Sequence, residues 1–451
     1  MRQTGVVRRS RSLPSTDREI LRLAVPAFGA LVAEPLFLLA DSAVVGRLGT
    51  APLAGLGVAG SLLASAIGVF VFLAYGTTAT VARRVGAGDL RAAVTDGVDG
   101  VWLAALLGVV VAALGGVLAV PLVAAFGASP EVADQAVTYL RWSLPGLPAM
   151  LVVLAATGIL RGLQDTRTPL VVAAAGAVAN VVLNVALVHG AGLGIAGSAI
   201  GTVLAQVGMA VAFLVVVVRA ARGTGASLRP DAPGIARVGR VGVPLLVRTL
   251  TLRAALLVTT YVAVAQGDAA LAAHQVATVV WGFLALALDA VAIAGQALTG
   301  RALGAGDADS ARTLTRRMLA WGVGAGVVLG LLLLAGRGLL APLFSPEPEV
   351  QSALTAVLVV VAIAQPLAGW VFVLDGVLIG AGDGRYLAVA GLWTLLAFLP
   401  LAALVLLAPV TGTVGLLWLW AAFSGGFMLA RAVTLGLRAR GDAWVVLGAA
   451  R

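Results

Sequence analysis

Long apolar segments separated by short polar ones recur along the whole chain. A segment such as "LWTLLAFLPLAALVLLAPV" (392–410) has the length needed to cross the roughly 30 Å hydrocarbon core of a bilayer. The pattern therefore predicts an all-α integral membrane protein. The expected spans are 20–46, 52–77, 94–119, 132–159, 168–189, 194–219, 238–264, 270–299, 313–336, 350–380, 386–408 and 412–437.

Composition agrees with this pattern. Of 451 residues, 61% are hydrophobic and only 11% are charged, and the mean hydropathy is +1.05. Soluble domains carry about 25% charged residues, so this chain could not cover itself with a polar surface. There is no cysteine, and His189 and His274 stand alone. With no nucleophile–base pair and no ligand cluster, we expect no enzyme, no metal site and no cofactor.

The two halves of the chain repeat one another. "VGAGD" at 85–89 recurs as "LGAGD" at 303–307, and "GILRGLQDTR" at 158–167 recurs as "GVLIGAGDGR" at 376–385. Pro26 and Pro244 share the same separation of 218 positions. One ungapped register of this length indicates internal duplication. Each copy holds six spans, an even number, so both enter the membrane from the same side and the repeat is parallel.

The distribution of arginine predicts the orientation. The chain has a net charge of +10, and all 30 of its basic residues are arginine. With both termini in the cytoplasm, only Arg47, Arg141 and Arg337 fall in outer loops, as the positive-inside rule requires. The charge therefore indicates a membrane surface, and we expect no nucleic acid partner. We expect a monomer in the cell inner (plasma) membrane.

The expected domains follow from the spans and their polar connections. They are a cytoplasmic N-terminal tail (1–19), an N-terminal six-helix lobe (20–219), a cytoplasmic inter-lobe linker (220–237), a C-terminal six-helix lobe (238–437) and a cytoplasmic C-terminal tail (438–451).

Five polar residues inside the first lobe are candidates for a cation-coupling site. Glu34 and Asp41 share a face of the first span, Asn180 and Asn184 share a face of the fifth, and Thr202 lies on the sixth. A charge in the membrane costs about 2.5–3.5 kcal/mol, so such residues usually face a cavity and act there. Burial favours the neutral form of an acid. A proton or small-cation switch is one interpretation, and a hydrogen bond between neighbouring helices is the other.

Two features strengthen the first interpretation. Asp41 corresponds to Thr259 in the second copy, so the acid breaks the repeat and is not needed merely to build a lobe. Pro26 and Pro35 lie in the same span, where proline frees a carbonyl and can kink the helix.

The second lobe has its own intramembrane polar set. Arg248, Arg253, Asp289 and Asp375 balance in charge, and Gln296 lies near them in sequence. Buried ion pairs that join three helices are one interpretation. A second proton-linked or substrate-binding site is the alternative.

The chain resembles a known family in several motifs. These are "LADSAVVGRLG" (39–49), "AAHQVA" (272–277), "LDAVAIAGQALTGRALGAGD" (288–307) and "VLDGVLIGAGDGR" (373–385). They are similar to the multidrug and toxic compound extrusion (MATE) transporters, in particular their DNA-damage-inducible (DinF-type) branch, within the MOP flippase-like fold. The resemblance implies two pseudo-symmetric six-helix lobes, alternating access, and export of amphipathic, often cationic, organic compounds against an ion gradient.

The resemblance also assigns roles to single residues. Asp41 matches the family's coupling acid, and Asn180 and Thr202 match its polar partners. Asn184 is a departure, because related transporters often carry Asp there. Losing that carboxylate weakens a sodium site, so H⁺ is the expected coupling ion and Na⁺ the alternative. The partners implied are small organic substrates, protons and membrane lipids. A flippase for a lipid-linked or other amphiphilic substrate is the alternative function.

Overall fold

The computed structural model describes residues 15–449 and is helical throughout its membrane segments. Within these residues, twelve helical segments are long and apolar enough to cross a membrane. The predicted fold class, an all-α protein with twelve spans, is confirmed. Large apolar side chains on the outer surface, such as Leu339, Leu343 and Leu407, are about four-fifths exposed, as expected of surfaces that face lipid.

The six spans of the first half, the N-lobe, include three that are interrupted. The first, third and sixth spans are α1 (Ser15–Gly46), α4 (Leu90–Ala124) and α8 (Gly194–Thr224). The second is α2 (Thr50–Val69) followed by α3 (Phe72–Gly86). The fourth is α5 (Pro130–Ser143), η1 (Leu144–Gly146) and α6 (Leu147–Gly162), and the fifth is α7 (Arg167–Val185) with the π-helical η2 (Ala186–Gly190).

The second half, the C-lobe, is more continuous. Its first five spans are α9 (Ala232–Val264), α10 (Asp268–Gly304), α11 (Ala308–Phe344), α12 (Pro348–Gly380) and α13 (Gly384–Leu407). The last is α14 (Gly412–Trp420), the π-helical η3 (Ala421–Phe427) and α15 (Met428–Arg440).

Several helices extend beyond the predicted spans. The first begins at Ser15 rather than 20, and the connection between the lobes is non-helical only over 225–231, inside the predicted linker 220–237. Hydropathy marks the part of a helix in the hydrocarbon layer, whereas the backbone hydrogen bonds continue into polar turns. Residues 1–14 of the predicted N-terminal tail and 450–451 of the C-terminal tail lie outside the described residues.

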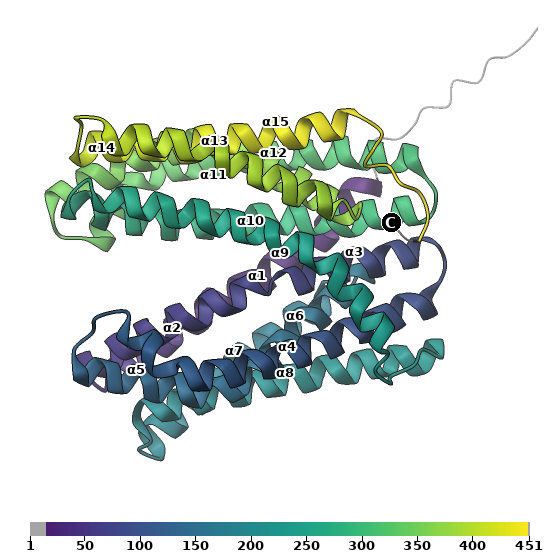
Figure 1. Ribbon diagram of the computed structural model, residues 1–451, viewed down its shortest axis with the longest axis horizontal. Coiled ribbons are helices and arrows are strands. Elements are labelled where there is room, and N and C mark those ends of the chain that lie inside the picture. Colours follow the sequence, from purple (N-terminus) through teal and green to yellow (C-terminus); the bar gives the residue numbers. More distant parts are fainter. Residues whose placement is uncertain (1–14, 450–451) are drawn as a thin grey trace, which may run out of the picture.

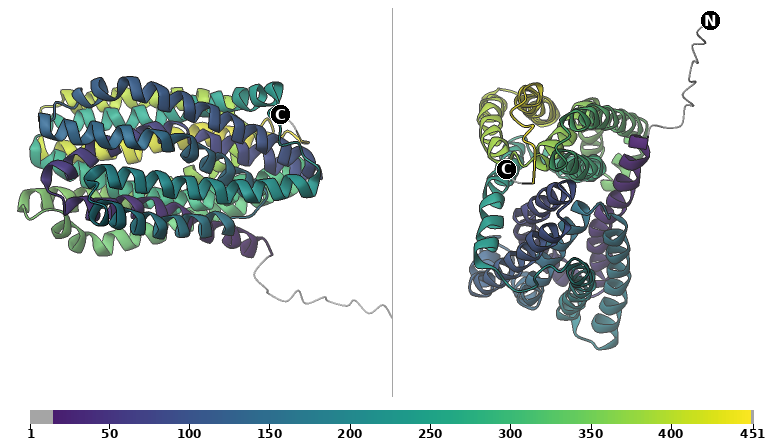
Figure 2. Two further views of the ribbon diagram at one scale, coloured as in Figure 1. Left: turned by 90° about the horizontal axis from the view of Figure 1, so that it is seen from below. Right: turned by 90° about the vertical axis from the view of Figure 1, so that its right-hand side faces the viewer.

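The two lobes lie side by side with their helices roughly parallel. In Figure 1 the purple-to-teal N-lobe and the teal-to-yellow C-lobe meet at the end that carries the C-terminus and diverge toward the opposite end. The right-hand view in Figure 2 looks along the helices from the C-terminal end and shows the lobes as two groups. The following contacts account for the junction between them.

The ends of α3 and α10 cross at a pseudo-twofold axis. A Cβ on Gly86 would lie 2.8 Å from the carbonyl carbon of Arg301, and a Cβ on Gly304 would lie 2.8 Å from that of Arg83. Gly86 and Gly304 are repeat mates, and so are Arg83 and Arg301, so each copy packs its glycine against the other copy. These two glycines belong to the repeated "GAGD" motif. The motif therefore joins the two lobes.

The same motif also ends one helix and starts the next. Gly88 and Gly306 have φ of 78° and 77°, values that favour glycine. The Asp89 carboxylate accepts a hydrogen bond from an amide in the first turn of α4, and Asp307 does the same for α11, 2.8 Å from the Ser310 nitrogen. The Ser310 hydrogen bonds hold the pKa of Asp307 below its ordinary value. Both acids are N-caps.

The first helix of each lobe packs against the other lobe near the crossing. Ile20 and Leu23 of α1 belong to the hydrophobic core that is built mainly by the C-lobe. Asp17 accepts two hydrogen bonds from Arg317, at 2.6 and 2.5 Å, and one from Trp321 Nε1 at 2.9 Å. The start of α1 is thus attached to α11, although the helix also packs on α7 of its own lobe.

The corresponding helix α9 makes the reverse contact with the N-lobe. Arg237 pairs with Asp96 of α4 at 3.2 Å, and a Cβ on Gly242 would lie 2.6 Å from the ring of Phe72. The two leading helices therefore cross between the lobes at the end that carries the C-terminus. Both leading helices therefore contribute to the inter-lobe contact.

Candidate coupling site and inter-lobe charge network

Asp41 lies at the centre of a buried polar cluster in the N-lobe. Its side chain is 3% exposed, and Asn180 and Asn184 are fully buried. The Asn184 amide donates a hydrogen bond to Asp41 Oδ1, and Thr202 Oγ1 lies 3.3 Å from Oδ2. Asn180 Nδ2 donates to Thr202 Oγ1 at 2.9 Å. The structure brings these four sequence-predicted residues together from α1, α7 and α8.

Local sequence explains how the three helices approach so closely. Gly201 of α8 faces Asn184, and a Cβ there would overlap the Asn184 side chain. Asn180 and Asn184 are four residues apart on α7 and so lie on one face. On this face, Asn184 Oδ1 is buried without a hydrogen-bond partner among the described residues. The cluster therefore keeps an unused acceptor beside the carboxylate.

Both predicted kink residues lie inside a helix that continues past them. Pro26 and Pro35 fall within α1, which is continuous over Ser15–Gly46. Proline cannot bond to the carbonyl four residues earlier. For Pro26 that carbonyl belongs to Arg22, and Thr166 Oγ1 donates to it at 3.5 Å. Thr166 thus occupies the acceptor that Pro26 leaves open, while the kink itself stays a prediction.

Glu34 is not part of the Asp41 cluster. The two acids share a face of α1, but seven residues of helix separate them by about 10 Å along the axis. The Glu34 side chain is exposed, and the charged group that acts on it is Arg253 of the C-lobe. Arg253 in turn reaches across to Gly68 of α2, where an added Cβ would lie 2.9 Å from its guanidinium carbon. Glu34 and Arg253 are therefore opposite charges on the two lobes, and no ion pair joins them among the described residues.

In the C-lobe, one of the two expected ion pairs is present. Arg248 and Asp375 form a hydrogen-bonded ion pair, with Arg248 Nε 3.1 Å from Oδ1. Arg431 of α15 adds a second cation at 3.2 Å, also to Oδ1. Sequence analysis missed Arg431, although an arginine inside the last apolar span is itself a signal of an internal partner. Arg253 takes no part in this cluster.

Asp289 has its hydrogen-bond partner in the other lobe. Tyr75 of α3 donates a hydrogen bond to Asp289 Oδ2 at 3.3 Å, and its ring lies 5.6 Å below the Arg248 guanidinium. Gln296 Nε2 donates to the Tyr75 carbonyl oxygen at 2.7 Å. Arg161 of α6 is the cation that acts most strongly on Asp289. The expectation of a second ion pair within the C-lobe is wrong, because the acid points toward the N-lobe.

Arg161 is a buried charge that the sequence analysis did not include among the site residues. Its side chain is only 7% exposed. It lies near the end of α6, where the turn of helix carries it toward Asp289 instead of solvent. Asp289, Tyr75, Arg161 and Gln296 therefore form a polar layer between the lobes, about two to four helical turns from the crossing at Gly86 and Gly304.

Taken together, the twelve helices, the two-copy architecture and the intramembrane carboxylates define a membrane transporter. A model of the MatE family matches the chain twice, over residues 26–186 and 244–404. The two matches start 218 positions apart, which is the offset of the internal repeat. The chain belongs to this family of multidrug transporters, which are not enzymes.

Known relatives agree with this assignment. The chain is 30% identical over 417 residues to "Protein DETOXIFICATION 44, chloroplastic" of Arabidopsis thaliana, covering 88% of this chain and 78% of the relative. It is 28% identical over 375 residues to "DNA damage-inducible protein F" of Escherichia coli, covering 82% of each. The Vibrio cholerae MATE transporter VcmN in its bent form has a similar fold, with a TM-score of 0.83 at 23% identity, covering 95% of this chain and 98% of that one.

Proposed function

We propose that the protein is a proton-coupled antiporter of the DinF-type branch, which exports amphipathic, often cationic, organic compounds by alternating access. Asp41 is the coupling carboxylate. The similarity to the Escherichia coli DNA damage-inducible protein F supports the branch. The names of further relatives, "Probable multidrug resistance protein NorM" among them, support the class of substrate.

The surroundings of Asp41 are the observation that carries the proposal. Within the described residues, its partners are an amide and a hydroxyl, and no ion pair reaches it. An ionised carboxylate held this way lacks a compensating charge, so binding of a cation or a proton changes its energy strongly. Asn184 supplies a neutral amide where a second carboxylate would strengthen a sodium site. A single carboxylate with neutral partners favours H⁺ over Na⁺.

The two ends of α1 suggest how the proton is coupled to movement. Asp41, in the second half of α1, bonds to Asn184 of α7, whereas Asp17 attaches the start of α1 to α11 of the C-lobe. Protonation removes the acceptor charge that holds Asn184 and Thr202, so this half of α1 can shift. The shift is carried along one continuous helix to the inter-lobe contact. Substrate affinity then changes with protonation.

The proposed orientation assigns the closed end to the cytoplasm. The lobes meet at the end carrying the C-terminus, where arginines are numerous, so both termini are assigned to the cytoplasm of a monomeric inner-membrane protein. The arrangement then corresponds to an outward-facing state. Asp375, held between Arg248 and Arg431, is assigned a structural role in the C-lobe, and Asp289 a role in lobe closure.

The test is transport of a fluorescent cationic dye in proteoliposomes. A pH gradient and a sodium gradient are imposed separately on the wild type and on Asp41→Asn. We expect only the pH gradient to drive wild-type transport and the variant to be inactive while remaining folded. Asp134→Asn, on the exposed face of α5, is the matched control and keeps full activity. Coupled transport at the wild-type rate by Asp41→Asn would refute the assignment.

A second readout separates the alternative function. Flipping of a fluorescent lipid-linked sugar analogue is measured in the same vesicles. If neither gradient moves dye while the lipid analogue crosses the bilayer, the protein is a flippase and the drug-export proposal fails.

A further inference from the structure

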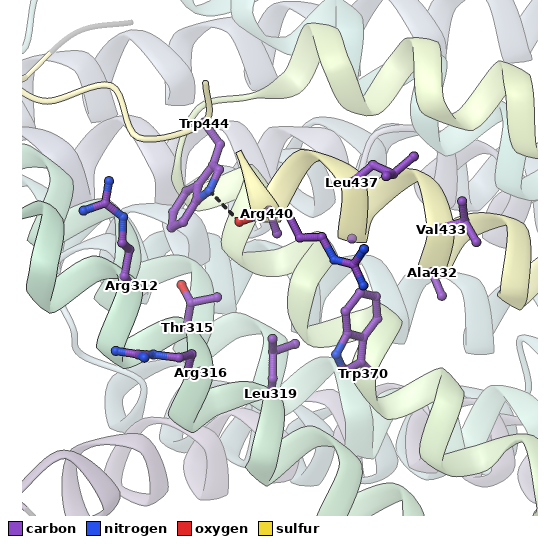
Figure 3. Close-up of a pocket in the computed structure, with 12 residues that line it drawn as sticks. Arg312, Thr315, Arg316, Leu319, Trp370, Ala432, Val433, Leu437, Arg440 and Trp444 are labelled. Atoms are coloured by element: carbon purple, nitrogen blue, oxygen red, sulfur yellow. Dashed lines mark hydrogen bonds between the residues drawn. The ribbon is translucent and has the colours of Figure 1, made fainter. Parts of the chain in front are cut away.

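A cavity of about 580 Å³ lies within the C-lobe, between α11, α12 and the end of α15. Figure 3 shows its lining side chains converging from the three helices and from the segment that follows α15. Leu319, Trp370 and Leu437 supply apolar surface, and Trp444 closes one side, with its indole nitrogen bonded to a backbone carbonyl of α15 at 3.3 Å. The cavity is far from Asp41 and plays no part in the mechanism above.

The charged residues of this cavity are all positive. Arg312, Arg316 and Arg440 line it, and no acidic residue does. Arg312 already pairs with Asp442 at 2.7 Å and with Asp309 at 3.3 Å. Arg316 and Arg440 are exposed, and neither has an ion pair or hydrogen bond in the described part of the chain. Two unpaired guanidinium groups thus flank one cavity.

The polar and apolar parts of the cavity lie at different depths. Arg312 stands in the second turn of α11 and Arg440 is the last residue of α15, so both are at the helix ends on the C-terminal side. Leu319 and Val433 each lie seven residues further into the membrane, about 10 Å at 1.5 Å per residue. Val433 is 52% exposed on the outer surface of the bundle. The cavity therefore opens sideways toward the bilayer.

We propose that this cavity binds a phospholipid with an anionic headgroup. The phosphate lies between Arg316 and Arg440, where charge-assisted hydrogen bonds replace the missing partners. One acyl chain runs past Leu319 and Trp370 toward Val433. The proposal uses the orientation given above, because anionic lipids concentrate in the cytoplasmic leaflet and basic cavities between helices on that side suit their headgroups.

The experiment compares lipid binding to the purified full chain by native mass spectrometry. Phosphatidylglycerol and phosphatidylcholine are titrated against the wild type and against the double variant Arg316→Gln/Arg440→Gln. We expect the wild type to prefer phosphatidylglycerol and the double variant to bind it roughly 30-fold more weakly, given two lost headgroup contacts. The matched control is Arg219→Gln/Arg222→Gln, two exposed arginines at the end of α8, and it keeps the preference.

A second measurement locates the acyl chain independently of the arginine variants. Phosphatidylglycerol with brominated acyl chains quenches tryptophan emission on contact, and Trp370→Phe should remove part of that quenching. Equal binding of both lipids, equal loss in the α8 control, or quenching unchanged by Trp370→Phe would each overturn the proposal. Displacement of the lipid by millimolar glycerol 3-phosphate would also overturn it, because the site would then bind a free anion.

Discussion

The contact between Gly86 and Gly304 makes a quantitative prediction about conformation. A Cβ on Gly304 would stand 2.8 Å from the Arg83 carbonyl carbon and 2.9 Å from its Cα. Carbon atoms pack at about 3.5–4.0 Å, so α3 and α10 must move apart by at least about 0.7 Å. Backbone atoms cannot rotate out of the way as a side chain can. The substitution Gly304→Ala therefore destabilises the inter-lobe contact itself.

The magnitude follows from the cost of overpacking. Extra methylenes forced into a packed contact cost about 1–3 kcal/mol. That cost applies only where α3 and α10 touch, so it shifts the equilibrium toward arrangements in which they separate. Each 1.4 kcal/mol changes an equilibrium constant about tenfold. The population of the closed arrangement relative to the separated one therefore falls by about 5-fold to 150-fold. Adding Gly86→Ala should give less than twice the effect, because the two glycines share one contact.

The assay measures distances between spin labels at the end carrying the C-terminus. The chain has no cysteine, so Arg91→Cys on α4 and Thr313→Cys on α11 give one labelled pair across the lobes. Double electron–electron resonance should show a single short distance in the wild type and a longer population in Gly304→Ala. Gly208→Ala is the control, because nothing lies within 4 Å of its added Cβ. A Gly304→Ala distribution identical to that of the control would refute the reasoning.

Three further outcomes are expected. Asn184→Asp places a second carboxylate beside Asp41, so transport and thermal stability should become sodium-dependent, and no response to Na⁺ in either assay would contradict this. Tyr75→Phe removes the hydroxyl that donates to Asp289 and should lower the unfolding free energy by about 1.5–3 kcal/mol, seen as a lower midpoint in thermal unfolding. The pKa of Asp307 is depressed in the folded state, so its stabilisation is present above its ordinary pKa of 3.8 and is lost as pH falls through the folded pKa. Asp307→Asn keeps an N-cap at every pH. On going from pH 7 to pH 3, the unfolding midpoint of the wild type should therefore fall relative to that of the variant.

The sequence by itself determined the membrane class, the number of spans and the duplication. Each follows from a signal along the chain. The length of each apolar segment matches the thickness of the hydrocarbon layer, and the constant offset of 218 residues, as between Pro26 and Pro244, indicates the repeat. It also brought Asp41, Asn180 and Asn184 into one candidate site. Helical periodicity puts Asn180 and Asn184, four residues apart, on the same face. The family resemblance, not periodicity, linked that face to Asp41 on another helix.

Only the tertiary structure decided which charges meet. Glu34 and Asp41 share a face, yet helix length separates them, and the cation that acts on Glu34 is Arg253 of the other lobe. Asp289 accepts a hydrogen bond from Tyr75, and Asp375 forms an ion pair with Arg431. Neither pair has a sequence spacing from which the contact could be predicted. Periodicity fixes the direction of a side chain around its own helix, but the neighbour it meets depends on how twelve helices are placed around an inter-lobe axis.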